Sequence, residues 1–270
     1  MPFCGASLMV VARPAVIDRI APTARPDTRI AGYQTWRNLL FLHWRVSPAE
    51  ARASVPDWLN VDYFDGSAWI GLVLFSMSGV RPWWSPPVPG VSAFPETNVR
   101  TYVHLDGGGP GVWFLSLDAG GSLAARIGRS RWGLAYHHSK MRVRRSGMRI
   151  RYESERLWPG QMGVGGRVEA EIGDVSSRLH RGVDPGRAVP GSLEHFLIER
   201  YILYTQKNDR LLRGRVHHVP YPLREAKVTF AEQSFLSDLG LHCDRPPDHV
   251  VFSEGVSVEV FPLRPVIGEA

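Results

Sequence analysis

Lysine is scarce in this sequence of 270 residues. Arginine supplies 29 of the 32 basic side chains, and the only lysines are Lys140, Lys207 and Lys227. An arginine side chain stays protonated and does not form a Schiff base, so imine chemistry is confined to these three positions. Despite the scarcity of lysine, the arginines give the chain a net charge of +6.

Cysteines and long hydrophobic runs are also few. There are two cysteines, Cys4 in the N-terminal tail and Cys243 far from it in sequence, which make neither a disulfide framework nor a Cys-x-x-Cys zinc motif. This usage favours a reducing compartment. No window of about 18 apolar residues occurs, so we expect no membrane-spanning segment. The apolar run 8–12 is ended by Arg13 and Pro14 and has no basic stretch before it. We therefore expect no signal peptide and predict a cytoplasmic protein.

The composition is that of a globular protein. Hydrophobic residues make up 44% and charged residues 21%, and nine Trp, eight Tyr and eleven Phe can form a sizeable core. Residues 1–29 contain four prolines and no sustained hydrophobic period, which predicts a weakly ordered extension. We expect residues 30–270 to form a single domain.

Strand patterns dominate the ordered part. The apolar run 68–75 predicts a strand buried on both faces, after an Asp65-Gly66 turn. Ser47, Pro48 and Glu50 form a capping box that predicts a short helix. A helix is also predicted after Ser192, with a stripe of Leu193, Phe196, Leu197, Tyr201 and Tyr204, and a third is predicted over 122–127. Strands are expected at 39–42, 98–105, 111–117, 141–145, 148–155, 228–230 and 250–260. The fold class is a β-rich α+β domain with two or three helices.

Three polar residues share one face of a predicted strand. Glu96, Asn98 and Arg100 alternate with Thr97 and Val99. They are either an ion pair at a strand edge or a polar row in a cavity, in which Arg100 can bind a carboxylate with two hydrogen bonds.

Histidines gather in two further segments. Tyr136, His137 and His138 precede Lys140, and a second pair is His217-His218. Neighbouring residues on a strand point to opposite faces, so a strand would place one histidine of each pair on a given side. The spacing matches no metal signature, so we expect hydrogen-bonded or acid/base histidines and neither a metal nor another cofactor.

The stretch from Arg126 to Arg156 is rich in arginine. Its arginines alternate with apolar residues as in a solvated hairpin, and no nucleic-acid motif accompanies them. We therefore expect no nucleic-acid partner.

Several blocks in fixed order resemble one bacterial family. They are Asn38-Leu39-Leu40-Phe41-Leu42-His43-Trp44, Asp65-Gly66-Ser67-Ala68-Trp69, Glu96-Thr97-Asn98-Val99-Arg100-Thr101-Tyr102, Gly111-Val112-Trp113-Phe114-Leu115-Ser116-Leu117-Asp118-Ala119 and His217-His218-Val219-Pro220-Tyr221-Pro222-Leu223. They resemble the YqjF-like family, a domain of unknown function, over about residues 33–263. More distantly, that family resembles the acetoacetate-decarboxylase-like fold. The resemblance implies a curved antiparallel sheet or barrel that encloses a pocket.

The resemblance also implies where a catalytic lysine would stand. In acetoacetate decarboxylases a lysine after a Gly-Phe-Pro stretch forms a Schiff base with a keto acid, and an upstream glutamate lines the pocket. Glu96 matches that glutamate and residues 133–135 match Gly-Phe-Pro, but Tyr136 and His137 follow. Lys140 is four residues past Tyr136. Because tyrosine and histidine cannot form an imine, we predict no Schiff-base decarboxylase activity.

Two functions remain open from the sequence. One is an enzyme with lyase- or isomerase-like acid/base chemistry on a small carboxylate- or carbonyl-bearing molecule. Its catalytic candidates are Glu96, Tyr136, His137 and His138, and its substrate-binding candidates are Arg100, Asn98, Trp69, Trp113 and His218. The other is a non-catalytic binding protein for an apolar or aromatic ligand, lined by Trp69, Trp83, Trp84 and Trp113. The sequence leaves the oligomeric state open, a homo-oligomer included.

Overall fold

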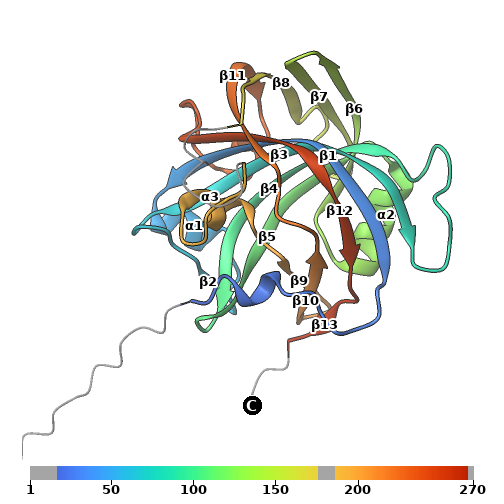
Figure 1. Cartoon of the computed structure of the whole chain (residues 1–270), viewed down its shortest axis with the longest axis vertical. Coiled ribbons are helices and arrows are strands. Elements are labelled where there is room, and N and C mark those ends of the chain that lie inside the picture. Colours follow the sequence, from blue (N-terminus) through green and yellow to red (C-terminus); the bar gives the residue numbers. More distant parts are fainter. Residues whose placement is uncertain (1–16, 176–185, 267–270) are drawn as a thin grey trace, which may run out of the picture.

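The computed structural model describes residues 17–175 and 186–266, so Cys4 and the apolar run 8–12 lie outside the described residues. The described part contains thirteen strands in one sheet and three α-helices (Figure 1). The strands are β1 (Gly32–Val46), β2 (Asn60–Val61), β3 (Ala68–Pro82), β4 (Phe94–Leu105), β5 (Gly108–Ala119), β6 (Tyr136–Ser146), β7 (Arg149–Trp158), β8 (Gly165–Ile172), β9 (Ile202–Lys207), β10 (Arg210–His217), β11 (Leu223–Gln233), β12 (His249–Val260) and β13 (Arg264–Pro265). The helices are α1 (Pro48–Ala53), α2 (Ser122–Trp132) and α3 (Leu193–Ile198), with 3-10 turns η1 (Ala21–Thr23) and η3 (Ser237–Leu239).

The sheet closes on itself twice. Its strand order is β13-β10-β9-β5-β6-β7-β8-β11-β12-β1-β3-β4-β2, with additional β10–β12 and β4–β5 pairings. The pairings β12-β1-β3-β4-β5-β9-β10 form a seven-stranded ring, and β5-β6-β7-β8-β11-β12-β1-β3-β4 form a nine-stranded one. Five strands are common to both rings, namely β12, β1, β3, β4 and β5. The pairs β5–β6 and β5–β9 are parallel. The predicted β-rich α+β fold with a curved sheet and two or three helices is confirmed, and the described part has three.

Two of the strands common to both rings, β1 and β3, are buried on both faces over part of their length. On β1, Leu39 and Phe41 join one apolar core, whereas Leu40 and Leu42 join a second. β3 divides in the same way, since Phe75 enters the first core and its neighbour Leu74 the second. This confirms the two-sided burial predicted for 68–75. Each such side chain contributes about 1.5–3 kcal/mol by leaving water.

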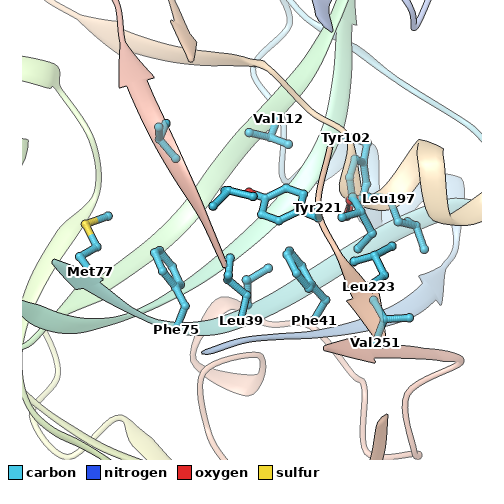
Figure 2. Close-up of a cluster of buried hydrophobic side chains, with 14 of the residues drawn as sticks. Leu39, Phe41, Phe75, Met77, Tyr102, Val112, Leu197, Tyr221, Leu223 and Val251 are labelled. Atoms are coloured by element: carbon cyan, nitrogen blue, oxygen red, sulfur yellow. Dashed lines mark hydrogen bonds between the residues drawn. The ribbon is translucent and has the colours of Figure 1, made fainter. Parts of the chain in front are cut away.

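The first core fills the seven-stranded ring. Figure 2 shows Phe75, Leu39 and Phe41 side by side on β3 and β1, with the ring of Tyr221 lying over them. Tyr102 and Leu197 close one end of the same cluster. The interior is therefore lined largely by aromatic and aliphatic side chains.

Two local predictions hold. The Ser47 side chain accepts from the Glu50 backbone N–H, and the Glu50 carboxylate accepts from the Ser47 backbone, so the capping box starts α1 as expected. Asp65 and Gly66 form a turn with positive φ angles of 49° and 70° ahead of β3. α2 begins at Ser122 as predicted, but its N-cap is Gly121 and it extends to Trp132.

The predicted helix after Ser192 is wrong in its second half. Ser192 caps α3 as expected, because its side chain accepts from the His195 N–H. The helix ends at Ile198, and Tyr204 lies on β9. β9 lies between β5 and β10 and exchanges backbone hydrogen bonds with both. This pairing outweighs the local helical spacing.

Residues before β1 contact the domain. Arg19 forms a salt bridge with the fully buried Asp62, which also pairs with Arg200 at 2.9 Å. Arg25 pairs with Glu259 on β12 at 2.6 Å. The division into an extension at 1–29 and a domain at 30–270 stays a prediction.

A buried ion network joins β5, β7 and η3. The Asp118 carboxylate accepts from Nε and Nη2 of Arg156, at 2.9 Å each, and from the Ser139 hydroxyl at 2.7 Å. Arg156 also pairs with Asp238 at 2.8 Å. Both Asp118 and Arg156 are at most 3% exposed, so loss of one charge would leave the other uncompensated in a low dielectric.

No helix in the described ranges is both long enough and apolar enough to cross a membrane.

We predict that Arg156→Met destabilises the protein by about 3–5 kcal/mol, since Asp118 then stays buried without its partner. Urea denaturation followed by tryptophan fluorescence measures the loss. The double variant Asp118→Asn/Arg156→Met removes both charges and should lose clearly less stability than the single variant. Equal stability of Arg156→Met and the parent protein would contradict a structural role for this pair.

Candidate functional site

A row of polar side chains on β4 faces the interior of the seven-stranded ring. Glu96, Asn98, Arg100 and Tyr102 alternate along the strand, and all four are buried. Phe94 and Tyr102 lie on the same face of β4 as this row and belong to the first core. Val99 lies on the opposite face and belongs to the second core. The burial of this row rules out an ion pair at an exposed strand edge, and the alternative of a polar row in a cavity stays a prediction.

Glu96 and Tyr136 meet across β5. Tyr136 pairs with Leu117 on β5, and Glu96 pairs with Ala119 two residues further on. The Tyr136 hydroxyl donates to Glu96 Oε2 at 2.8 Å. Gly128 in α2 makes room for this tyrosine, since a Cβ there would lie 2.3 Å from its ring. Two of the catalytic candidates, which are 40 residues apart in sequence, are thus in direct contact.

The Glu96 carboxyl is held in its neutral form. Burial raises its pKa to about 8, and hydrogen bonds from Tyr136 and Asn98 only partly oppose that rise. Burial, together with the neighbouring Glu96, raises the pKa of Tyr136 well above its ordinary value. A carboxyl that keeps its proton near pH 7 can serve as a general acid and, in its ionised fraction, as a base.

Arg100 carries a buried charge. Its Nη2 donates to the Leu197 carbonyl at 2.9 Å, and its guanidinium lies 5.7 Å from the ring centroids of both Phe41 and Tyr102. Within the described ranges its Nε has no hydrogen-bond partner and no carboxylate forms a salt bridge with it. A buried guanidinium in this setting suits an anionic ligand.

The two histidines of β6 point to opposite faces. His137 Nδ1 lies 2.7 Å from the Pro159 carbonyl, and burial lowers the pKa of this histidine. Asp118 and Arg156 act on His137 electrostatically, which places it toward the buried ion network. His138 is two residues after Tyr136 on β6 and therefore shares its face of the strand. The ring centroid of His138 lies 6.4 Å from that of Trp158. The Glu96 hydrogen bonds in the described part go to Tyr136 and Asn98.

The remaining predicted binding residues divide between cores. Trp69 belongs to the first core, together with Tyr102. Trp113 packs against a third apolar core, which includes Ile202 and Tyr204. The structure therefore does not bring Trp113 to the polar row.

His218 lies in an aromatic group. Its ring centroid is 4.5 Å from those of Tyr201 and Tyr221 and 5.8 Å from that of Trp36. Burial lowers the pKa of His218 to about 4, so its ring is neutral. His218 Nδ1 lies 2.8 Å from the Val219 carbonyl, and Nε2 is left without a partner in the described part.

Three interior residues were missed in the sequence. Tyr102 continues the alternation of the β4 row, so the same pattern could have found it. Tyr221 precedes β11 and Glu199 follows α3, where no periodicity applies. Glu199 accepts from the Tyr201 hydroxyl at 2.5 Å and from the Tyr221 N–H at 3.0 Å, and burial raises its pKa.

Two hollows on the molecule lie away from the polar row. One, of about 510 Å³, is lined by Trp58, Leu105, Asp209, Arg210, Leu211, Pro265 and Val266. The other, of about 380 Å³, is lined by residues of 161–164 and by Ser234, Ser237 and Asp238. Among residues 17–175 and 186–266, no group of three or more His, Cys, Asp or Glu side chains has a metal-holding arrangement.

Solved structures with a similar fold are enzymes or enzyme-like proteins. The enduracididine biosynthesis enzyme MppR complexed with pyruvate has a TM-score of 0.54 at 14% identity, covering 90% of this chain and 93% of that one. Acetoacetate decarboxylase from Legionella pneumophila has a TM-score of 0.56 at 13% identity, covering 95% and 97%. An acetoacetate decarboxylase-like enzyme from Sphingomonas wittichii RW1 has a TM-score of 0.59 at 11% identity, covering 88% and 94%. At these identities the likeness establishes the acetoacetate-decarboxylase-like fold alone.

Sequence comparison is more specific. The model of the family DUF2071, described as an uncharacterized conserved protein, matches residues 33–257. The uncharacterized protein YqjF of Bacillus subtilis (strain 168) is 32% identical over 231 residues, which cover 86% of this chain and 90% of that protein. The chain therefore belongs to this YqjF-like family of uncharacterized conserved proteins.

Proposed function

We propose that this protein is an enzyme that acts on a small carboxylate- or carbonyl-bearing molecule inside the seven-stranded ring. The observation that carries the proposal is the buried Glu96–Tyr136 pair, whose carboxyl has its pKa near 8, on the same strand face as the Arg100 guanidinium. Buried acids of this kind, combined with a specific partner, are typical of functional sites. The first core fills this interior, so binding of the ligand would require some of its side chains to move apart.

The residues divide into two ends of one site. Glu96, hydrogen-bonded by Tyr136 and Asn98, would transfer a proton to or from the ligand, while Tyr136 would also donate to a developing oxyanion. Arg100 would hold a carboxylate at the end nearer α3. Because a strand rises about 3.3 Å per residue, the Cα atoms of Glu96 and Arg100 lie ~13 Å apart along β4, and the two side chains extend from the same face of the strand. Asn98 lies between them and would contact the middle of the ligand.

The lysine positions support chemistry without a Schiff base. Lys140 and Lys227 are exposed on β6 and β11. Lys207 Nζ donates to the Ser130 carbonyl at 2.6 Å, at the C-terminal end of α2. An imine-forming amine must stand desolvated in the pocket, and none of these three positions meets that requirement. Proton transfer by Glu96 is therefore favoured over the amine chemistry of acetoacetate decarboxylases.

A second candidate is a non-catalytic binding protein for an apolar or aromatic ligand. The interior of the ring favours it, since Phe41, Phe75, Tyr102 and Tyr221 surround the polar row (Figure 2). Tryptophan quenching by such a ligand without any turnover would support this candidate over the enzyme.

We predict that Glu96→Gln lowers any proton-exchange activity by about 10²–10⁴-fold, the range typical of a lost general acid or base. Pyruvate and acetoacetate in D₂O are the first probes, because hydrogen–deuterium exchange beside their carbonyl is visible by NMR. Glu155→Gln, which alters an exposed acid on β7, is the matched control and should keep full activity.

Two further results bear on the same assignment. Exchange at the parent rate in folded Glu96→Gln would remove Glu96 from the mechanism, and loss of folding in that variant would make Glu96 structural. Borohydride treatment with acetoacetate should leave no stable adduct on the parent protein. An adduct on Lys140 would establish amine chemistry after all.

The raised pKa of Glu96 predicts a pH-dependent stability. The pKa of the folded carboxyl is about 8, so it stays protonated up to about that pH, whereas in the unfolded chain it ionises near the ordinary glutamate value of 4.5. Its contribution to folding is therefore complete below about pH 4.5 and is lost as the pH rises to about 8, by at most ~5 kcal/mol. Urea denaturation at pH 5 and pH 8 should show a smaller pH effect in Glu96→Gln than in the parent. An identical effect in both would contradict the raised pKa.

We predict that Arg100→Gln weakens binding of a small carboxylate by about 10- to 100-fold, since a charged hydrogen bond contributes about 1.5–3 kcal/mol. Calorimetric titration with pyruvate measures it. Arg142→Gln removes an exposed arginine from β6 and serves as the matched control. Unchanged affinity in a folded Arg100→Gln protein would place the anion site elsewhere.

A further inference from the structure

The connection between β3 and β4 displays large apolar side chains to solvent. The exposed fractions of Trp83, Trp84, Val88 and Val91 are 47%, 69%, 51% and 42%. The whole stretch 82–91 contains no charged residue and includes four prolines. Figure 1 shows this connection projecting from the side of the molecule. Contiguous exposed apolar side chains of this size mark an interaction surface.

Backbone hydrogen bonds define the shape of this connection. The Trp83 N–H donates to the Ala31 carbonyl at 3.1 Å, which ties its start to the residue before β1. The Val88 N–H donates to the Ser92 hydroxyl at 2.8 Å, and the Ser92 N–H donates back to the Val88 carbonyl at 2.9 Å. The indole of Trp84 is therefore held outward by an organised loop.

Arginines lie at the base of the loop. The Arg29 guanidinium lies 3.8 Å from the ring centroid of Trp83, and Arg81 donates to the Ser85 carbonyl at 3.2 Å. Both arginines therefore place a positive charge at the edge of the exposed apolar surface. This arrangement resembles the interfacial side chains of membrane-associated proteins, in which indoles and cations lie at headgroup level.

Helix α2 begins close to the residues that follow the loop, and it also exposes apolar side chains together with arginines. The Gly120 N–H donates to the Pro95 carbonyl at 2.9 Å, and a Cβ at Gly121 would lie 3.0 Å from the Phe94 ring. α2 exposes Leu123 and Ile127 at 51% and 46%. It contains three arginines and no acid.

We propose that the loop 82–91, with α2 beside it, docks this protein onto a bilayer surface that carries anionic headgroups. Trp84 and Val88 would insert at the level of the headgroups, while Arg29, Arg81 and the α2 arginines would lie against the phosphates. The net charge of +6 adds a long-range attraction to such a surface. This is association with one leaflet and involves no segment that crosses the membrane.

Charge and shape favour a bilayer over a second copy of this chain. In a symmetric dimer through this face, the arginines of both copies would approach each other without acidic partners from α2. A projecting loop also needs a matching cavity on a protein partner, whereas a fluid bilayer accepts it without one.

Vesicle flotation with the full chain tests the proposal. The probes are phosphatidylcholine vesicles with and without about one third phosphatidylserine, at low and high salt. We expect binding to the anionic vesicles, weaker at high salt, and at least tenfold weaker for Trp84→Ala/Val88→Ser. Trp58→Ala removes another exposed tryptophan (44%), from the hollow lined by Leu105 and Pro265, and should bind as the parent does.

Three results would overturn the proposal. The first is no flotation of the parent protein with anionic vesicles at low salt. The second is equal flotation of Trp84→Ala/Val88→Ser, which would locate the contact elsewhere on the basic surface. The third is a dimer in sedimentation equilibrium that this variant converts to a monomer, since a second copy would then cover the loop. Circular dichroism and urea denaturation confirm that the variants are folded, because both altered side chains are largely exposed.

Discussion

The burial of β1 and β3 on both faces is the constraint on which the rest of the molecule depends. A strand with a single buried face leaves its other face in water, but here successive side chains enter two different cores. Both rings of the sheet need this common wall, and neither closes without it. Because the wall has no solvated face, polar residues on its interior must find partners inside the protein.

The polar row of β4 follows from that position. Glu96 lies against the first core, where ionisation is costly, so the carboxyl keeps its proton and bonds to Tyr136 and Asn98. The Arg100 guanidinium contacts the Leu197 carbonyl and two aromatic rings. Arg156 differs from Arg100, because its buried guanidinium forms salt bridges with two carboxylates, Asp118 and Asp238. Arg156 therefore has its charge balanced within the network, whereas no carboxylate in the described part forms a salt bridge with Arg100, and this difference is the reason for proposing an anion there.

The inner and outer surfaces of the molecule divide the proposed roles. The ring interior holds Glu96, Tyr136 and Arg100, to which we assign proton transfer and anion binding as a proposal, and the loop after β3 carries exposed indoles beside arginines. These two regions are linked through one strand pair, since the loop connects β3 to β4 and β4 carries Glu96 and Arg100. A ligand of the interior and a surface that holds the protein in place are therefore compatible on one small domain.

The sequence by itself determined the strand-rich class, the capping box of α1, the two-sided burial of 68–75 and the alternation of Glu96, Asn98 and Arg100. Each of these depends on residue spacing within one segment, which local periodicity reports directly. Only the tertiary structure decided that Tyr136 meets Glu96 across β5, that Trp113 packs in another core, and that the chain after Ile198 continues as a strand. Those outcomes depend on the pairing of β9 and β6 with β5, which brings together residues distant in sequence, and no single segment encodes such a pairing.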